Sequence, residues 1–265
     1  MSATLLPALF VSHGAPLFAL EPGETGPALR HWAQQLPTDM RGIVVLSPHW
    51  MTRSPTVMTT VQPETWHDFG GFPAALYQLE YPAAGSPALA QVVIAKLQAA
   101  GFAAQGDDQR PLDHGTWVPL MHLFPQAQVP VVQVALPAGV GPKEVYAMGL
   151  AVKDLRAQGA LVVGSGSMTH NLGEFFGGQT QPASYVMEFS RWVESAITRG
   201  DRTALLNYRE LAPHAVRAHP TDDHFLPLFF ALGAAGWGQG DATQVDYLSR
   251  EVLHGMLAMD AFALQ

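Results

Sequence analysis

The 265-residue sequence contains no cysteine. It therefore forms no disulfide bonds, and any metal ion would have to be bound through nitrogen and oxygen atoms. Charged residues are scarce as well, at 14% of the chain, and the 14 Lys and Arg residues do not gather in clusters. Because a nucleic-acid-binding surface needs clustered cations to contact phosphates, we exclude that class of function.

Long apolar runs are also missing. No stretch approaches the ~20 residues that cross a membrane, and residues 1–4 lack the basic start of a signal peptide. We therefore expect a cytoplasmic protein with neither membrane nor nucleic-acid partners. Hydrophobic residues still make up 48% of the chain, which is enough for a sizeable core. With no internal repeat and no linker, residues 1–265 are expected to form a single domain.

Histidine, by contrast, is abundant, with 11 residues in the chain. Three apolar, valine-containing runs each end in a turn that carries a serine and then a histidine: 5–11 leads to His13, 43–46 to His49, and 161–163 to His170. Such runs predict buried strands. Ligands of open α/β sheets bind beyond the carboxyl ends of the strands, so the three histidines are expected to meet at one site.

The remaining pattern predicts an α/β fold, with one mixed sheet flanked by helices and a site at the C-terminal ends of its strands. Further strands are expected at 56–61 and 129–136, and helices at 27–36, 87–100, 142–158 and 182–199. The segments 245–248 and 251–259 are expected to be strands that pair with each other. Other histidines have no predicted chemistry: we expect His31 on the surface, His122 in the core or on the surface, and His254 in a structural role.

Two more histidines lie where helices are expected to begin. His114 is in the turn Asp113-His114-Gly115-Thr116. Helix capping explains the aspartate and the threonine of this turn, but not the histidine between them. Near the C-terminal end of the chain, Thr221 or Asp222 is expected to cap a helix with His224 in its first turn.

The segment 64–73 mixes aromatic residues with glycines. Such a loop is able to form the wall of a pocket, and the alternative is a hydrophobic loop packed onto the core. We take His67, Phe69 and Phe72 as candidate substrate-binding residues. The segment carries no Lys or Arg that would bind a substrate carboxylate.

Five histidines at one site favour metal chemistry. Imidazole nitrogens suit zinc, copper, iron and nickel. Three histidine ligands with an open position make a catalytic site, and further histidines nearby would move protons or donate hydrogen bonds to substrate. The residues alone therefore predict a mononuclear metal enzyme, without revealing its reaction.

Five segments in order along the chain carry a resemblance to a known family. They are 11–16, 46–50, 113–119, 164–172 and 219–227. Together they resemble the class III extradiol ring-cleavage dioxygenases (LigB-like), and within them the 4,5-DOPA dioxygenase branch. The resemblance implies that the chain is a single catalytic domain of a non-haem Fe(II) enzyme. Such an enzyme uses O₂ to open a catechol ring beside its two hydroxyl groups and gives a semialdehyde.

The resemblance also implies roles for the histidines. His13, His49 and His224 would bind the metal. His170 would be the acid and base, close enough to the metal to ligate it in a resting or zinc-loaded form. His114 would bind substrate or incoming oxygen.

One position departs from the pattern of the protocatechuate-cleaving relatives, which carry a glutamate where this chain has His224. Three neutral histidines leave the metal site at a formal charge of +2, which favours zinc, so Fe(II) and Zn(II) both remain candidates. Asp222 or Asp223 remains an alternative third ligand. Two other functions stay open: a zinc-dependent hydrolase on the same scaffold, and a metal-binding relative without catalysis.

Overall fold

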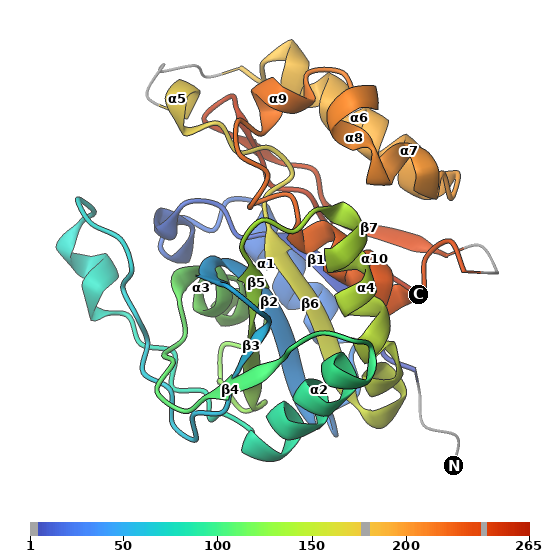
Figure 1. Ribbon diagram of the computed structural model, residues 1–265. Coiled ribbons are helices and arrows are strands. Elements are labelled where there is room, and N and C mark those ends of the chain that lie inside the picture. The colour runs from blue at the N-terminus through green and yellow to red at the C-terminus, as the bar shows by residue number, and fades with distance from the viewer. Residues whose placement is uncertain (1–4, 176–180, 240–242) are drawn as a thin grey trace.

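The computed structural model describes residues 5–175, 181–239 and 243–265. Its centre is an eight-stranded sheet in the order β4-β3-β5-β2-β6-β1-β10-β7 (Figure 1). The strands are β1 Ala8–Ser12, β2 Gly42–Thr52, β3 Thr56–Met58, β4 Gln105–Asp107, β5 Val131–Pro137, β6 Ala160–Gly166, β7 Val245–Ser249 and β10 Ala261–Leu264. A separate pair joins β8 Val252–Leu253 to β9 Leu257–Ala258.

The four central strands, β5, β2, β6 and β1, run parallel, whereas β10 pairs antiparallel with β1 and β3 pairs antiparallel with β5. The predicted mixed α/β sheet is thus confirmed. β5, β6 and β1 are buried along their whole length. Their sequences are apolar runs rather than alternating patterns because helices cover both faces of the sheet.

Helices α1 Thr25–Ala33 and α3 His114–Leu123 pack together on one face of the sheet. The other face carries α2 Pro87–Ala99, α4 Pro142–Val152 and α10 Pro227–Ala235 (Figure 1). Among the described residues, a group of five helices, four of them short, lies beyond the carboxyl ends of the central strands (Figure 1). It contains α5 Leu172–Phe175, α6 Ser184–Thr198, α7 Arg202–Leu206, α8 Tyr208–Leu211 and α9 Ala215–Ala218.

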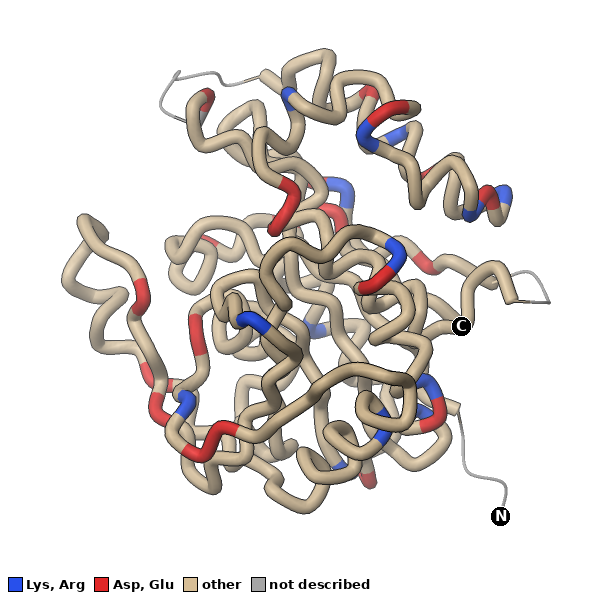
Figure 2. Tube along the Cα trace, in the orientation of Figure 1, with Lys and Arg blue, Asp and Glu red and all other residues tan. Residues whose placement is uncertain are grey.

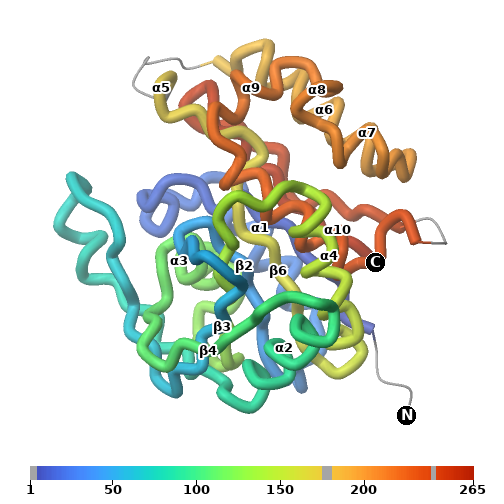
Figure 3. The backbone as a smooth tube through the Cα atoms, viewed as in Figure 1, coloured from blue at the N-terminus to red at the C-terminus, as the bar shows by residue number. Residues whose placement is uncertain are grey.

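A long excursion between β3 and α2 projects from the body of the molecule (Figure 3). We call residues 64–80 of this excursion the aromatic arm. The arm contains the short 3₁₀ helix η2 Ala74–Gln78. Two other 3₁₀ helices are η1 Pro16–Ala19, which follows β1, and η3 Lys153–Gln158, which continues α4.

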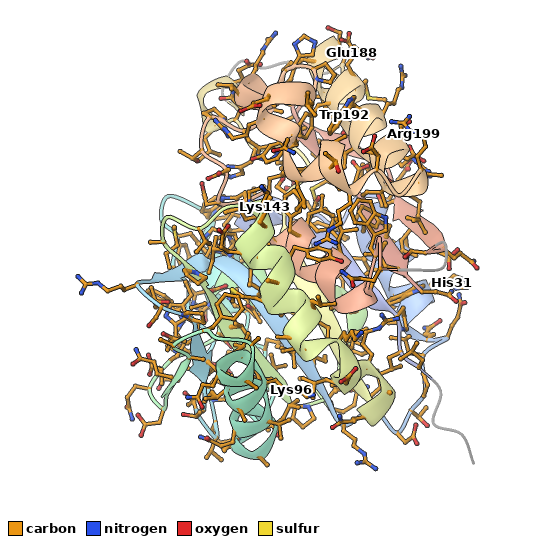
Figure 4. All side chains as sticks on the ribbon, turned by 45° about the vertical axis from the view of Figure 1, so that its right-hand side comes forward. His31, Lys96, Lys143, Glu188, Trp192 and Arg199 are labelled. Carbon is orange, nitrogen blue, oxygen red and sulfur yellow. The ribbon has the colours of Figure 1, made fainter. Side chains whose placement is uncertain are left out.

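The surface charges agree with the composition. Lys and Arg are scattered over the described chain rather than gathered on one face (Figure 2). His31 is exposed on α1, as predicted (Figure 4). His122 is buried and donates its Nε2 hydrogen to the carbonyl of Phe18, and His254 lies in the turn between β8 and β9. Among the described residues, no helix is both long and apolar enough to span a bilayer.

Two predictions near the C-terminal end of the chain were wrong. The last helix does not include His224: α10 begins at Pro227, whose ring suits a first helical position. Residues 222–226 form a turn instead, in which the carbonyl of Asp222 accepts hydrogen bonds from Phe225 and Leu226.

The second error concerns strand pairing. Segment 245–248 does not pair with 251–259, because β7 pairs with β10 while β8 and β9 pair with each other. The other helices and strands lie near their predicted positions with shifted ends. The segment expected as one helix over 142–158 is divided into α4 and η3.

Candidate metal centre

The ends of the parallel strands position the first histidines. His13 directly follows β1, and His170 follows β6 after a short turn. His49 lies within β2, at an irregularity where the pairing with β5 jumps from Ser47 to Met51. A bulge of this kind leaves residues without a cross-strand partner and redirects their side chains, which lets a strand residue face the site.

Close backbone approach positions the other two histidines. His114 begins α3, where the Asp113 carboxylate accepts a hydrogen bond from Thr116 N–H at 3.2 Å and caps the helix. The carbonyl of His224 accepts a hydrogen bond from Ser167 N–H at 2.8 Å. A Cβ atom at Gly166 would lie 2.3 Å from that carbonyl oxygen, so only glycine lets the turn of His224 approach β6.

These elements bring all five predicted histidines together. The Nε2 atom of His49 lies 3.1 Å from Nε2 of His13 and 3.3 Å from Nε2 of His224. The ring of His114 packs beside the ring of His49, with centroids 3.9 Å apart. The ring of His170 stacks on that of His224 at 3.7 Å and an angle of 3°.

The outer nitrogen of each of two converging rings has a partner that fixes its proton. The Ser165 hydroxyl donates to the carbonyl of Gly115, so it accepts from Nδ1–H of His13 at 3.1 Å. The Asp223 carboxylate accepts from Nδ1–H of His224 at 2.5 Å. Both Nε2 atoms therefore present lone pairs to the site.

Two nitrogens bound to one ion at about 2.0–2.1 Å lie roughly 3 Å apart, which is the spacing of Nε2 of His49 from the Nε2 atoms of His13 and His224. The donor set thus fits a metal ion. One group of possible ligand atoms, from His13, His49 and His114, lies within 4.8 Å of one another. Two histidine triads are therefore available, which share His13 and His49 and differ in whether His224 or His114 is third.

The environment keeps His13, His49 and His170 uncharged. Burial, reinforced by the neighbouring histidines, lowers the pKa of His13 well below its ordinary value and lowers that of His49 in the same way. Burial and His224 lower the pKa of His170 to about 3. A metal binds only neutral imidazole, so the folded protein holds these rings in the state that ligation requires.

Two carboxylates lie immediately behind the histidines. Asp223 is bonded to His224, and Asp68 accepts a hydrogen bond from Nδ1–H of His114 at 2.9 Å. Burial acts to raise the pKa of each carboxyl, but the histidine hydrogen bonds and charges outweigh it and hold both pKa values below their usual range. Both carboxylates are therefore ionised and add negative charge beside the site.

A buried polar network contacts the bulge of β2 next to the site. The Asp113 carboxylate, fully buried, accepts hydrogen bonds from Ser47 at 2.8 Å and Arg110 at 2.7 Å, and another from Gln133. Arg110 also donates to the carbonyl of His49 at 3.3 Å. The network thus ties the capping residue of α3 to the strand that carries His49.

Apart from Asp68, the aromatic arm contacts the site through the ring of Phe69. The edge of Phe69 meets the His114 ring, with centroids 5.6 Å apart, and Phe72 packs behind Phe69 at 5.4 Å. His67 donates its Nε2–H to the carbonyl of Leu79 at 3.0 Å, and its ring contacts Phe69, Tyr77 and Trp117. Of the three predicted substrate-binding residues, Phe69 is thus the one whose ring contacts a site histidine.

Sequence reasoning missed Asp68 and Ser165 and gave Asp223 a different candidate role. The signal for Asp68 was its place between His67 and Phe69, both of which were singled out. The signal for Asp223 was its position directly before His224. Ser165 had no local signal, since its importance depends on the approach of His13 from another strand.

Comparisons with known proteins agree with this site. The family model described as the catalytic LigB subunit of aromatic ring-opening dioxygenase matches residues 7–255. A protein named 4,5-DOPA dioxygenase extradiol from Beta vulgaris is 37% identical over 230 residues, 86% of either chain. The protein of that name from Escherichia coli K12 is 36% identical over 238 residues, 88% of this chain and 87% of the relative.

The fold has a solved counterpart as well. A crystal structure of an uncharacterised protein from Escherichia coli K12 superimposes with a TM-score of 0.79 at 27% identity, covering 98% of this chain and 100% of the other. The resemblance inferred from the five sequence segments is confirmed. The chain belongs to the LigB family of extradiol aromatic ring-opening dioxygenases.

Proposed function

We propose that this dioxygenase binds Fe(II) through His13, His49 and His224 and opens the ring of a catechol, DOPA or a close analogue, with O₂. The product is a semialdehyde. The observation that carries the proposal is the position of three Nε2 atoms. Nε2 of His49 lies 3.1 Å from Nε2 of His13 and 3.3 Å from Nε2 of His224.

The orientation of the rings supports His224, rather than His114, as the third ligand. Nε2 of His224 faces Nε2 of His49, and its Nδ1–H is held by Asp223 at 2.5 Å. Metal-binding histidines commonly have a carboxylate on the nitrogen that does not bind the metal. The ring of His114 lies beside that of His49 rather than opposite it, which suits a group that contacts bound substrate.

The nearby carboxylates support iron. Three neutral histidines would leave a divalent ion at a formal charge of +2. Ionised Asp68 and Asp223, which are hydrogen-bonded to His114 and His224, bring two negative charges close to the ligands. The centre as a whole is therefore close to neutral, and the expected bias of an all-histidine site toward zinc is reduced. An Fe(II) ion held by His13, His49 and His224 would supply the Lewis acidity and the redox chemistry that ring opening with O₂ requires.

The protein supplies the proton acceptor and the substrate contacts. His170 is uncharged, with a pKa lowered to about 3, so a ring nitrogen has a lone pair for a catechol proton. With so low a pKa, His170 would accept a proton only from an acidic hydroxyl, and a divalent ion held by the neighbouring histidines would supply that acidity. His114 and Phe69 bound the space beside the site, and we assign them to binding the substrate.

The substrate assignment rests on relatives and on the arm. Relatives with 36–37% identity carry the name 4,5-DOPA dioxygenase extradiol. The aromatic arm, with His67, Phe69 and Phe72 as its proposed substrate-binding residues, presents rings to a flat aromatic substrate. We further propose that residues 1–265 work as one catalytic domain, since the family match and the sheet both extend over nearly the whole chain.

The test is oxygen uptake by metal-free protein reloaded anaerobically with Fe(II) or with Zn(II), and then given air and a panel of catechols that includes DOPA. We expect uptake and the yellow absorbance of a semialdehyde with Fe(II) alone. The absence of uptake with every catechol, together with stoichiometric zinc, would refute the proposal. Ester and amide substrates would then test the zinc hydrolase instead.

A further inference from the structure

Asp68 is the point at which the aromatic arm meets the metal centre. Its side chain is 8% exposed. One carboxylate oxygen, Oδ1, accepts two hydrogen bonds from His114, from the backbone N–H at 3.0 Å and from Nδ1–H at 2.9 Å. The other oxygen, Oδ2, lies 3.8 Å from Nδ1 of His49. A single carboxylate thus faces the outer nitrogens of two neighbouring histidines.

This arrangement places the proton of His114 on Nδ1 and, through the charge of the carboxylate, favours the same form of His49. A carboxylate accepts hydrogen bonds and does not donate them, so it favours the Nδ1–H form of both rings. Nε2 of each ring then keeps its lone pair on the side of the site. The charge of Asp68 is also favourable there, because it offsets part of the charge of a bound divalent ion.

The arm is also attached at its base, and its helix η2 contacts η1 and buries Leu76 in the core. The backbone of Trp66 donates to Leu112 O at 2.8 Å, and Trp66 O accepts from Trp117 Nε1–H at 3.0 Å. Beyond Asp68, Phe69 touches the His114 ring. The tip at Gly70 and Gly71 has open space around both residues. Asp68 therefore stands between a fixed base and an unsupported tip.

We propose that Asp68 is a positioning residue that couples the metal centre to the aromatic arm. Its carboxylate orients His49 toward the metal and His114 toward the substrate, and the same contacts hold this part of the arm against the centre. The proposal rests on the proposed ligation of the metal by His49. It makes two consequences inseparable, since a protein that loses the carboxylate loses metal affinity and loses the attachment of the arm together.

The test compares Asp68→Asn with the wild type, using Zn(II) in competition with a chromophoric chelator. Asparagine has nearly the same shape, but its amide places a donor next to either His114 N–H or His49 Nδ1–H. We expect metal binding to weaken by about 10- to 100-fold, as for other groups that orient ligating histidines. The matched control is Asp108→Asn, an exposed carboxylate that bonds to its neighbour Gln109, and it should bind Zn(II) as the wild type does.

A second readout follows the arm directly. Chymotrypsin cleaves after aromatic residues that do not precede proline, and the arm contains three such residues, Trp66, Phe69 and Tyr77. We expect Zn(II) to protect the wild-type arm from cleavage at these residues and to protect the arm of Asp68→Asn much less. A residue that only stabilised the fold would change cleavage with and without metal alike. If Asp68→Asn does not fold, Asp68→Ser, which leaves room for water, carries the same expectations.

Wild-type zinc affinity in the folded variant, or wild-type protection of its arm by zinc, would overturn the proposal. Neither measurement involves oxygen uptake. A wild-type protein that takes up no oxygen with any catechol would therefore count against the proposed function. The proposal about Asp68 would still be decided by zinc affinity and by protection from chymotrypsin.

Discussion

His13 and His224 are oriented from the sheet side of the centre, whereas His49 and His114 are also oriented by a carboxylate from the arm. On the sheet side, Ser165 lies in the buried end of β6 and Asp223 directly precedes His224. On the arm side, Asp68 belongs to a projecting loop (Figure 3). The difference suggests a division of work, in which the sheet side serves the metal alone and the arm serves both the metal, through Asp68, and the substrate.

The largest effects that test this comparison are expected when His224, the proposed third ligand, and His114, the alternative third ligand, are each replaced. We expect His224→Ala to lose bound metal and essentially all activity. His114→Ala should keep the metal and lose about 10²- to 10⁴-fold in kcat/KM, the usual contribution of a proton-transfer or hydrogen-bonding group. Metal content after dialysis and oxygen uptake measure both, with exposed His31→Ala as the control. Retained metal in His224→Ala and lost metal in His114→Ala would reverse the assignment.

A smaller effect is expected for the carboxylate on the sheet side. Asp223→Asn removes the charge that holds Nδ1–H of His224, and metal affinity should fall by about 10- to 100-fold. Once the variant is saturated with metal, its KM for catechol should match that of the wild type, because Asp223 does not touch the arm. In Asp68→Asn we expect KM to rise as well. Equal changes of KM in the two variants would contradict the division of work.

The aromatic rings of the arm, unlike Asp68, should respond in substrate binding alone. Phe69→Ala removes the ring that touches His114, and we expect KM to rise about 5-fold, which corresponds to about 1 kcal/mol for an aromatic pair beyond its buried area. Phe72→Ala, one ring further out, should change KM less. Steady-state kinetics on the catechol that gives the fastest uptake compare the two variants. A loss of metal in either one would show that the arm contributes to ligation itself.

The smallest effect on activity is expected at Asp260, a buried carboxyl whose backbone carbonyl accepts from Ser12 N–H beside His13. Burial raises the pKa of Asp260 to about 7. An unfolded chain ionises this group near its ordinary value, so the native state loses stability as pH rises from the unfolded to the folded pKa, and the loss levels off above it.

Replacing that carboxyl should remove the pH-dependent loss. Relative to the wild type, Asp260→Asn should gain about 2 to 3 kcal/mol of unfolding free energy between pH 5 and pH 8. Urea unfolding at the two pH values measures the gain. A constant difference between the two proteins would mean that the native carboxyl is ionised throughout.

Local patterns predicted the histidines well, because each lies beside a strong local signal. Valine-rich runs followed by turns identified the strand ends at His13, His49 and His170, and the parallel strands then gathered them at one edge. The same reasoning failed for the start of α10. Asp222 resembles a capping residue in the sequence, but Pro227 begins the helix and leaves His224 in the preceding turn.

Long-range contacts were beyond the reach of the pattern. The strand β10 is a short segment near the chain end, and nothing local showed that it would lie between β1 and β7. The partners of the histidine Nδ1 atoms were likewise not predictable from the local sequence. Asp68 and Ser165 reach their histidines across 46 and 152 residues of chain, so only the folded arrangement reveals them.

The most direct measurement of the central claim is a crystal structure of the zinc-loaded protein with anomalous data at the zinc edge. We predict zinc bonded at about 2.0–2.1 Å to Nε2 of His13, His49 and His224. Asp68 and Asp223 should remain hydrogen-bonded behind their histidines. Zinc bonded to His114 in place of His224, or directly to either carboxylate, would contradict the account.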